Sequence, residues 1–339
     1  MGLRVALVGA TGAVGAQFLD ILGKGRLQVD ELRLLASKRS VGKSLDFHGQ
    51  SLPVAEATPD SFEGIDVAFV TAGGDISREL CPAAAKAGAI AVDDSSVFRL
   101  EPGVPLVVPE INADDLEGHH GIVSTPNCCT VPVAMALHTL RQASPIRSVI
   151  TSTYQSVSGA GTAAVRELTE QSAQVLAGEA VKPDVFPHQI AFNALPQVDK
   201  FLDDGYTAEE WKMREEARKI LGAPGLPFSA TCVRVPVFQA HSFAVNVEFE
   251  GPVSPATARR LLSEMPGVRL SDTGTGDPYA HPVEAAGTDD VFVGRIREDT
   301  ARPNGLVLWI TADNLRKGAA LNCIQIAEEL LRRDLFPKR

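Results

Sequence analysis

The sequence predicts an α/β protein with two parts: an N-terminal doubly wound parallel sheet, and a C-terminal α+β domain with a mixed or antiparallel sheet. Up to about Pro126, short aliphatic runs alternate with helical stretches, which is the pattern of parallel strands joined by helices. Beyond Cys129, apolar and polar residues alternate over longer runs, which indicates strands with one covered face. The length of 339 residues also exceeds that of one ordinary domain.

The expected elements follow from these runs in chain order. In the first part, strands are predicted at 4–8, 31–36, 67–71, 90–93 and 106–108. The second takes long strands at 148–155 and 243–249, and the last helical stretch lies within 314–335. We therefore expect a first domain over 1–128, completed by a C-terminal helix within 314–339, and a second domain over 129–313.

The composition excludes several classes of protein. Apolar residues make up 45% of the chain and charged residues 22%, as in soluble globular proteins. No apolar run approaches the roughly 20 residues of a membrane helix. The N-terminus lacks a secretory pattern, so we expect a cytoplasmic protein. A net charge of -10 disfavours binding to nucleic acid or to membranes. The five cysteines have no spacing typical of a disulfide framework or a metal site, so neither is predicted.

The segment 9–15 has the features of a dinucleotide-binding turn. Gly9, Gly12 and Gly15 follow the first expected strand and precede a helical stretch. In a Rossmann-type sheet such glycines permit a tight turn and the close approach of a pyrophosphate, whose charge is met by the amides at the helix start. The turn therefore predicts a cofactor site.

The residues at the end of the second strand indicate whether the site binds NAD or NADP. NAD sites usually place an acidic side chain there to accept hydrogen bonds from the ribose hydroxyls. Here residues 37–40 read Ser-Lys-Arg-Ser, and the guanidinium of Arg39 matches the geometry of a 2′-phosphate. This pattern favours NADP over NAD. The alternative is that 37–40 forms a solvated loop.

Cys128 is the candidate nucleophile. It precedes a stretch with apolar residues on one helical face, so it should lie at or just before a helix N-terminus, where amide dipoles stabilise a thiolate. Cys129 would point about 100° away around the helix, by the geometry of 3.6 residues per turn. The alternative is that both cysteines are small buried hydrophobes.

His241 is the candidate proton partner for such a nucleophile. It follows one apolar strand and precedes another, at a bend where its ring could face a pocket together with Arg234. The other histidines lie in polar loops, near turns or on a helix. Spacing alone does not place His241 beside Cys128.

Taken together, these segments resemble aspartate-semialdehyde dehydrogenase in its bacterial form, over essentially the whole chain. The matching stretches are the Gly9 to Gly15 turn, Pro126-Asn127-Cys128, 94–99, 108–112, 155–161, 209–213, 234–242 and 313–319. Several matches in order are far more specific than any one of them.

The resemblance implies reversible, phosphate-dependent interconversion of L-aspartate 4-semialdehyde and L-4-aspartyl phosphate, with NADPH in the biosynthetic direction. It thus implies an NADP-dependent phosphorylating aldehyde dehydrogenase that acts in the biosynthesis of lysine and diaminopimelate, threonine, methionine and isoleucine. It also implies a homodimer in which 1–128 is the NADP-binding domain and 129–313 the catalytic and dimerisation domain. Chemistry then makes Cys128 the carrier of a thioester and His241 the general acid and base.

The resemblance also carries over the contacts with substrate and cofactor. Gln155 would orient the substrate, and Asn127 would contact it. Arg234 would hold the α-carboxylate and Glu209 the α-ammonium. Arg99 and Lys212 would bind phosphate. The expected cofactor contacts are Gly9, Thr11, Gly12, Ala13, Val14, Arg39, Ser40, Ser158, Gly159 and Asn314.

Two further interpretations stay open at this point. N-acetyl-γ-glutamyl-phosphate reductase would share the fold and the thioester, but a carboxylate at Glu209 suits a free ammonium rather than an acetamide. Without the resemblance, Glu209 and Lys212 would be taken for a surface ion pair. A catalytically silent, nucleotide-binding paralogue is the other alternative, and the joint presence of Cys128, Gln155 and His241 argues against it. Cys129 and the pair Asp93-Asp94 depart from the family pattern.

Overall fold

The computed structural model describes residues 2–271 and 277–337. The chain divides into two compact units, one of residues 1–127 with 319–339, and the other of residues 128–318. Each unit is described by itself. Among the described residues, no helix is both long and apolar enough to cross a membrane.

The first unit is built on a seven-stranded sheet with the order β3-β4-β2-β1-β5-β6-β7. Its strands are β1 (Leu3–Val8), β2 (Val29–Ala36), β3 (Ser44–Phe47), β4 (Gln50–Glu56), β5 (Val67–Val70), β6 (Ile90–Asp93) and β7 (Ile122–Ser124). All neighbours pair in parallel except the edge strand β3, which runs antiparallel to β4. The predicted doubly wound parallel sheet is therefore confirmed, with one antiparallel edge.

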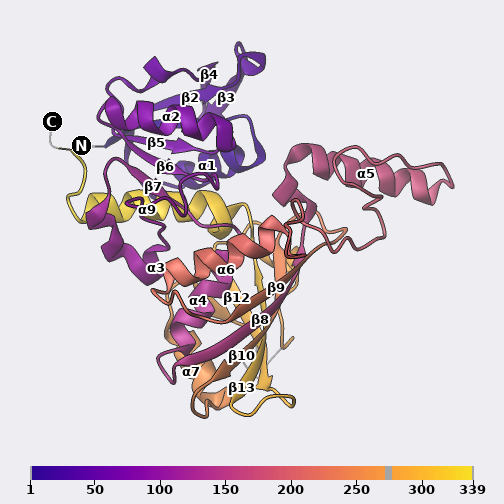
Figure 1. Ribbon diagram of the computed structural model, residues 1–339. Helices are drawn as coiled ribbons and strands as arrows, with labels where there is room; N and C mark the ends of the chain where they lie inside the picture. Colours follow the sequence, from indigo (N-terminus) through magenta and orange to yellow (C-terminus); the bar gives the residue numbers. More distant parts are fainter. Residues whose placement is uncertain (1, 272–276, 338–339) are drawn as a thin grey trace. The chain divides into compact units, whose positions relative to one another are not determined.

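Helices cover both faces of this sheet (Figure 1). They are α1 (Ala13–Gly23), α2 (Gly74–Lys86), α3 (Pro109–Asn112) and α9 (Leu321–Arg332). On β1, Val5 and Leu7 face a core shared with α1 and α9, whereas Ala6 and Val8 face a second core shared with α2. A strand buried on both sides can be apolar throughout, which explains the continuous aliphatic run at 4–8.

The second unit is built on a six-stranded sheet with the order β11-β12-β13-β10-β8-β9. Its strands are β8 (Ile146–Gln155), β9 (Phe228–Arg234), β10 (His241–Phe249), β11 (Val268–Leu270), β12 (Val291–Glu298) and β13 (Gly305–Ala312). The central pairs are antiparallel, while β8 with β9 and β11 with β12 are parallel. Of the two predicted kinds of sheet, the mixed one is present.

One face of this sheet is covered by helices of the same unit. These helices include α4 (Thr130–Leu140), α6 (Ala208–Ile220) and α7 (Pro255–Glu264), whereas α8 (Pro282–Ala285) is a single turn near β13. The apolar residues of β10, Phe243, Val245, Val247 and Phe249, are fully buried. On the opposite face, Ile150 and Tyr154 remain exposed on β8.

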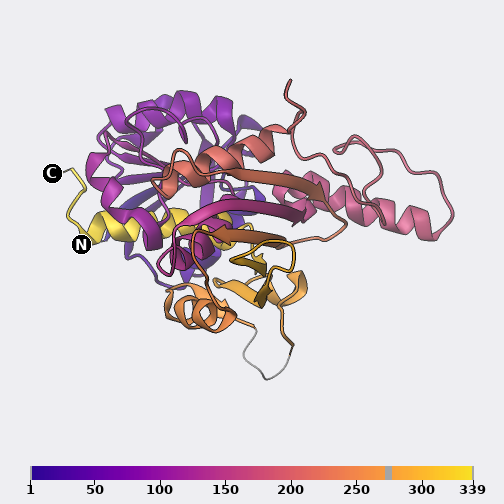
Figure 2. The same cartoon turned by 60° about the horizontal axis from the view of Figure 1, so that its bottom comes forward.

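Helix α5 (Thr162–Leu176) extends away from the sheet of its own unit, as the two views show (Figures 1 and 2). The chain from 177 to 206 that follows has no helix or strand longer than an isolated bridge. Frequent prolines and glycines account for this irregular course.

The structure corrects three expected elements. Residues 106–108 form no strand, because only Leu106 makes a bridge, to Ser124. The hairpin of β3 and β4 was not expected, since these two strands carry few buried residues. The helix expected within 314–335 begins as a π-helical turn at Arg316–Ala320 and becomes α-helical only at Leu321.

Candidate active site

The turn after β1 has the geometry of a phosphate-binding loop. Gly9 has φ +89°, a left-handed conformation that favours glycine, and an added Cβ would lie 2.6 Å from the carbonyl oxygen of Thr71. Gly12 is the N-cap of α1 and has no side chain to occupy the helix start. First-turn amides have no acceptor within their helix, so those of Ala13 and Val14 suit an anionic group. The residues present therefore fit a dinucleotide.

The segment after β2 fits a 2′-phosphate. Residues Lys38–Ser40 form a 3₁₀ turn, in which Lys38 and Arg39 are exposed and Ser40 is buried. The hydroxyl of Ser40 lies 3.2 Å from that of Thr11 in the glycine turn, so the two segments meet. This places an exposed guanidinium and two hydroxyls beside the expected dinucleotide site.

The candidate catalytic residues of the second unit gather at one edge of its sheet. Gln155 ends β8, and Arg234, its partner in register, ends the parallel strand β9. His241 begins β10, which runs antiparallel to β8, so it lies at the same edge. The fold thus brings together Gln155 and His241, which are 86 positions apart in the chain.

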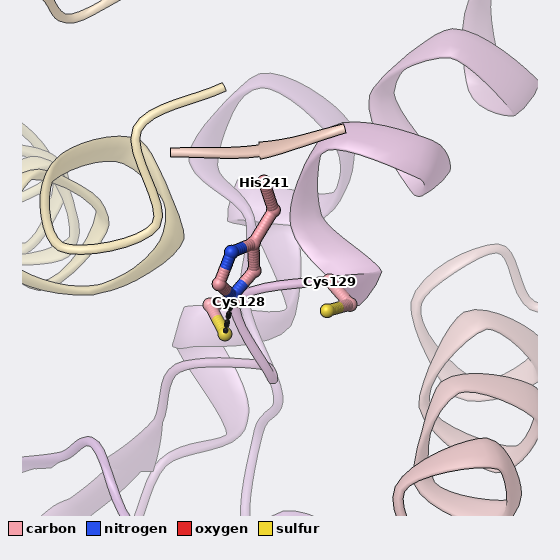
Figure 3. A group of neighbouring side chains, drawn as sticks. All are labelled: Cys128, Cys129 and His241. Carbon is pink, nitrogen blue, oxygen red and sulfur yellow. Dashed lines mark hydrogen bonds between the residues drawn. The ribbon is translucent and has the colours of Figure 1, made fainter. Parts of the chain in front are cut away.

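Cys128 lies beside His241, two residues before α4 begins at Thr130 (Figure 3). Its Sγ is 3.5 Å from the imidazole Nε2. The Cys128 side chain is half-buried, whereas His241 is buried. A nucleophile and a proton acceptor within hydrogen-bond reach define the arrangement needed for covalent catalysis.

Ser156 fixes the tautomer of His241. The backbone N–H of Ser156 donates to Nδ1 over 3.0 Å, so Nδ1 is an acceptor. In the neutral ring the proton then resides on Nε2, where it can be donated to the Cys128 sulfur. Sequence reasoning missed Ser156, since its contribution comes mainly from the backbone.

The Cys128 thiol is activated. A hydrogen bond from Cys129 and the neighbouring His241 lower the pKa of Cys128 well below the ordinary thiol value, against the opposing effects of burial and of the Glu209 carboxylate. The thiolate is the reactive form, so the fold prepares this sulfur as a nucleophile. By contrast, burial raises the pKa of Cys129, so that thiol stays protonated and can donate.

This pKa predicts the pH dependence of alkylation. Because the pKa of Cys128 is lowered, its thiolate persists at pH values where a free thiol is protonated, and iodoacetamide should label it there. In Cys129→Ala the hydrogen bond is lost, and the midpoint of the labelling rate against pH should move upward. Peptide mass spectrometry after timed labelling gives the rate for Cys128 alone. A midpoint that is the same in both proteins would show that Cys129 does not stabilise the thiolate.

The expected angle between Cys128 and Cys129 assumed that both residues lie within a helix. An angular separation of about 100° applies only within a helix, and α4 begins after both cysteines. The two sulfurs and an imidazole nitrogen of His241 all lie within 4.8 Å of one another. In Figure 3 the Cys129 sulfur points toward the side of Cys128.

Arg234 is positioned against the same imidazole. It is buried, and its Nη1 donates to the Ser156 carbonyl oxygen over 2.7 Å. Gly159 leaves room for both side chains, because an added Cβ would lie 3.0 Å from Arg234 Nη1 and 3.2 Å from His241 Nε2. A buried guanidinium has further N–H donors in a rigid fork that suits a carboxylate.

Glu209 is buried and Lys212 is half-buried, so their ion pair is not one of the open surface. Their charged atoms are 2.8 Å apart, and the side chains are 7% and 18% exposed. Gln155 Nε2 also donates to Glu209, over 3.2 Å, and Asp199 lies 2.9 Å from the ammonium. Burial opposes the charge on Lys212, but Glu209 and Asp199 outweigh it and raise the pKa of Lys212.

Helix α6 begins with a capping box. Thr207 N–H donates to the Glu210 carboxylate over 2.7 Å, and Glu210 N–H donates to the Thr207 hydroxyl over 3.4 Å. Glu210 is therefore occupied by the helix start. Glu209, next to it, is left to face the site with Lys212.

Ser158 and Asn314 are tied into the loop that holds His241. Asn314 Oδ1 accepts hydrogen bonds from the Ser158 and Ser156 hydroxyls and from the Ala240 N–H, over 3.0, 3.2 and 3.0 Å. Ala240 has φ +70°, a strained conformation for alanine that this contact supports. The side-chain amide oxygen of Asn314 therefore stabilises this loop. Contact with a cofactor stays a prediction for Ser158 and Asn314.

The remaining predicted residues belong to the first unit. Arg99 is buried, and its Nη2 donates to the Asp94 carbonyl oxygen over 2.9 Å. Asn127 is also buried, directly before the nucleophile in the chain. The acid Asp93, which departs from the family pattern, accepts hydrogen bonds from the N–H and hydroxyl of Ser95 and so closes the turn after β6. Phosphate binding by Arg99 and substrate contact by Asn127 stay predictions.

A dinucleotide turn in one unit and a cysteine–histidine pair in the other define the class of semialdehyde dehydrogenases, and the comparisons agree. Residues 4–119 match the family model described as the semialdehyde dehydrogenase NAD binding domain. Residues 137–317 match the model of the semialdehyde dehydrogenase dimerisation domain. An NAD(P)-binding domain is thus present.

Individual relatives narrow the class. The chain is 48% identical to aspartate-semialdehyde dehydrogenase of Bacillus subtilis, over 98% of this chain and 99% of that protein. It is also 48% identical to that of Aquifex aeolicus, over 99% and 100%. The crystal structure of aspartate semialdehyde dehydrogenase II from Vibrio cholerae, complexed with ASA, has a TM-score of 0.95 and 41% identity, and covers 98% of this chain and 99% of its own. The chain belongs to the aspartate-semialdehyde dehydrogenase family, a family of oxidoreductases.

Proposed function

We propose that this chain catalyses the NADPH-dependent reductive dephosphorylation of L-4-aspartyl phosphate to L-aspartate 4-semialdehyde. The observation that carries the proposal is the 3.5 Å contact between Cys128 Sγ and His241 Nε2, with the Cys128 pKa lowered. The relatives that bear the enzyme's name match nearly the whole chain. The reaction serves the biosynthesis of lysine and diaminopimelate, threonine, methionine and isoleucine.

The first half of the reaction follows from the chain's own residues. The Cys128 thiolate attacks the acyl carbon of the substrate, a carbon–sulfur bond forms, and the carbon–oxygen bond to phosphate breaks. The imidazolium form of His241, which holds the proton taken from the Cys128 thiol, gives a proton to the departing phosphate oxygen. The ring then returns to its neutral form, in which Ser156 N–H donates to Nδ1. The result is a thioester on Cys128 and inorganic phosphate.

The reduced nicotinamide, when bound, supplies the hydride that brings the acyl carbon to the aldehyde level. The sulfur is then the leaving group, and its low pKa makes it a good one. Burial of His241, Gln155 and Arg234 limits the access of water, which protects the thioester from hydrolysis.

The ends of the substrate are assigned by charge. Arg234 holds the α-carboxylate through the donors of its fork, and Glu209 meets the α-ammonium. Gln155, held to Glu209, orients the substrate next to the nucleophile. An ammonium has three N–H donors, and the contacts of Lys212 to Glu209 and Asp199 use two, so a third serves phosphate.

Turnover with defined substrates tests the proposal. Purified protein should reduce NADP with L-aspartate 4-semialdehyde only when inorganic phosphate is present. Omitting phosphate is the matched control, because hydrolysis of the thioester by water would not require it. Activity only with N-acetyl-glutamate 5-semialdehyde would assign the second enzyme instead, and inactivity with both would favour the silent paralogue.

NADP specificity is proposed from Arg39 and Ser40. Replacing Arg39 by alanine should raise the KM for NADPH about 10- to 100-fold, since a hydrogen bond to a charged group is worth about 1.5 to 3 kcal/mol. The KM for NADH, which has no 2′-phosphate, should hardly change. Arg78→Ala on α2, an exposed arginine of the same unit, controls for loss of charge. An equal loss with both cofactors would exclude a contact with the 2′-phosphate.

The proposed assembly is a homodimer formed by the second unit. Two observations support it: residues 137–317 match a dimerisation domain, and the sheet face with Ile150 and Tyr154 is exposed in the single chain. Cofactor binding is assigned to the first unit, and catalysis to the second. A cytoplasmic location stays a prediction.

A further inference from the structure

Cys128, Cys129 and His241 form a compact cluster of atoms that bind soft metal ions (Figure 3). Their two sulfurs and one imidazole nitrogen all lie within 4.8 Å of one another. We propose that this cluster binds a thiophilic divalent cation, of which Zn²⁺ and Cd²⁺ are examples, and that the bound cation prevents Cys128 from accepting an acyl group. The binding is independent of the proposed function, whereas the inhibition rests on it.

The geometry is close to that of a tetrahedral site. With a zinc–sulfur distance of about 2.3 Å and a zinc–nitrogen distance of about 2.0 Å, the two ligand atoms are about 3.5 Å apart. Cys128 Sγ and His241 Nε2 are separated by 3.5 Å before any adjustment. Two sulfurs on one zinc are about 3.8 Å apart. Because the two sulfurs lie within 4.8 Å of each other, their separation has to change by at most about 1 Å, from 4.8 to 3.8 Å, to reach that value.

The proton balance of binding involves all three ligands. The two thiols bind as thiolates, so up to two protons pass to the solvent for each cation. A metal on Nε2 moves the ring proton to Nδ1. The Ser156 hydroxyl oxygen, 3.0 Å from Nδ1, can then accept a hydrogen bond from this N–H group. The Ser156 N–H, which donates to Nδ1 in the free protein, opposes this change, so we expect weaker binding than at structural zinc sites with four protein ligands.

Cys129 is what distinguishes this cluster from an ordinary catalytic pair. A cysteine and a histidine alone offer two ligands, and the second thiol makes a chelate of three. Cys128 is half-buried while Cys129 and His241 are buried, so a cation enters the cluster from the side of Cys128. The fourth coordination position is left to water.

Cadmium binding to the purified protein tests the site without turnover. Titration with Cd²⁺ should produce the ultraviolet sulfur-to-cadmium charge-transfer band with the intensity of two thiolates. In Cys129→Ala the band should fall to one thiolate, and affinity should drop about 100-fold, as expected for one of a few ligands that share the binding energy. Cys81→Ala, which removes a buried thiol outside the cluster, is the matched control. Equal intensity and affinity in Cys129→Ala would overturn the proposal.

Inhibition by Zn²⁺ tests the consequence. Turnover should fall at the concentrations that fill the site and return when a chelator is added. Each variant is compared with its own rate without metal, and Cys129→Ala should need about 100-fold more Zn²⁺. Cadmium binding in a protein that never turns over would refute the proposed function but support the metal site. Full turnover with the metal site filled would refute the proposal that the bound cation prevents acylation of Cys128.

Discussion

Replacing Cys128 by alanine should lower kcat by at least about 10⁴-fold, the scale of loss when a covalent nucleophile is removed. Alanine cannot form the thioester, and no other group takes its place, since Cys129 is buried with a raised pKa. Steady-state reduction of NADP with L-aspartate 4-semialdehyde and phosphate measures the loss. Intact-protein mass spectrometry of the protein with aspartyl phosphate should detect an acyl adduct only when Cys128 is present.

Cys129→Ala is the matched control for this loss, because it removes the adjacent thiol. That variant should retain turnover. It loses a hydrogen bond to the thiolate, and each unit by which the Cys128 pKa rises costs at most about tenfold in thiolate fraction. Full activity of Cys128→Ala would show that this sulfur is not the nucleophile. An acyl adduct on Cys129 in that variant would assign the role to the neighbouring thiol.

Much of the fold could be predicted from the periodicity of apolar residues. Strands buried on both faces, such as β1 and β5, appear as continuous aliphatic runs, and β10 alternates because one face alone is buried. The same rule misassigned 106–108, where buried apolar residues make one bridge instead of a strand. It also missed β4, whose residues are mostly exposed next to the edge strand β3. The periodicity of apolar residues therefore predicts which residues are buried, but not which of them pair in a strand.

The candidate site was predictable where function resides in side-chain chemistry. Cys128 and His241 could be named because a nucleophile and a proton acceptor are specific residue types, although 113 positions separate them. Ser156 could not, since it acts through its N–H and carbonyl groups, which every residue type except proline possesses. The direction of Cys129 depended on where α4 begins, and a shift of one or two residues in a helix start changes which side chains meet.

The environment of Glu209 and Lys212 also could not be predicted from the local sequence. At a spacing of three residues the sequence fits a surface ion pair or a buried one equally well. In the fold, where α6 packs against β9, Glu209 is buried, Lys212 is half-buried, and Asp199 from a distant loop joins them. Tertiary contacts thus decide whether such a pair belongs to a site.

Replacing His241 by glutamine should lower kcat by about 10²- to 10⁴-fold, the range typical of general acid and base catalysis. Glutamine can still place an N–H near the position of Nε2 and so donate to the Cys128 sulfur. It cannot take up and return a proton, so proton transfer to the departing phosphate is lost. Acyl-enzyme should therefore form slowly but at the same cysteine, which rapid-quench mass spectrometry can follow.

His138→Gln provides the control, because His138 is a half-buried histidine of the same unit whose Nδ1 contacts Arg141 instead. That variant should keep the rate of acylation. Affinity for NADPH, measured by fluorescence, should be unchanged in both variants, so that a loss in kcat reports on chemistry. If His241→Gln acylates as fast as the unmodified protein, the proton must reach phosphate by another route. The 3.5 Å contact would then serve only to hold the thiolate.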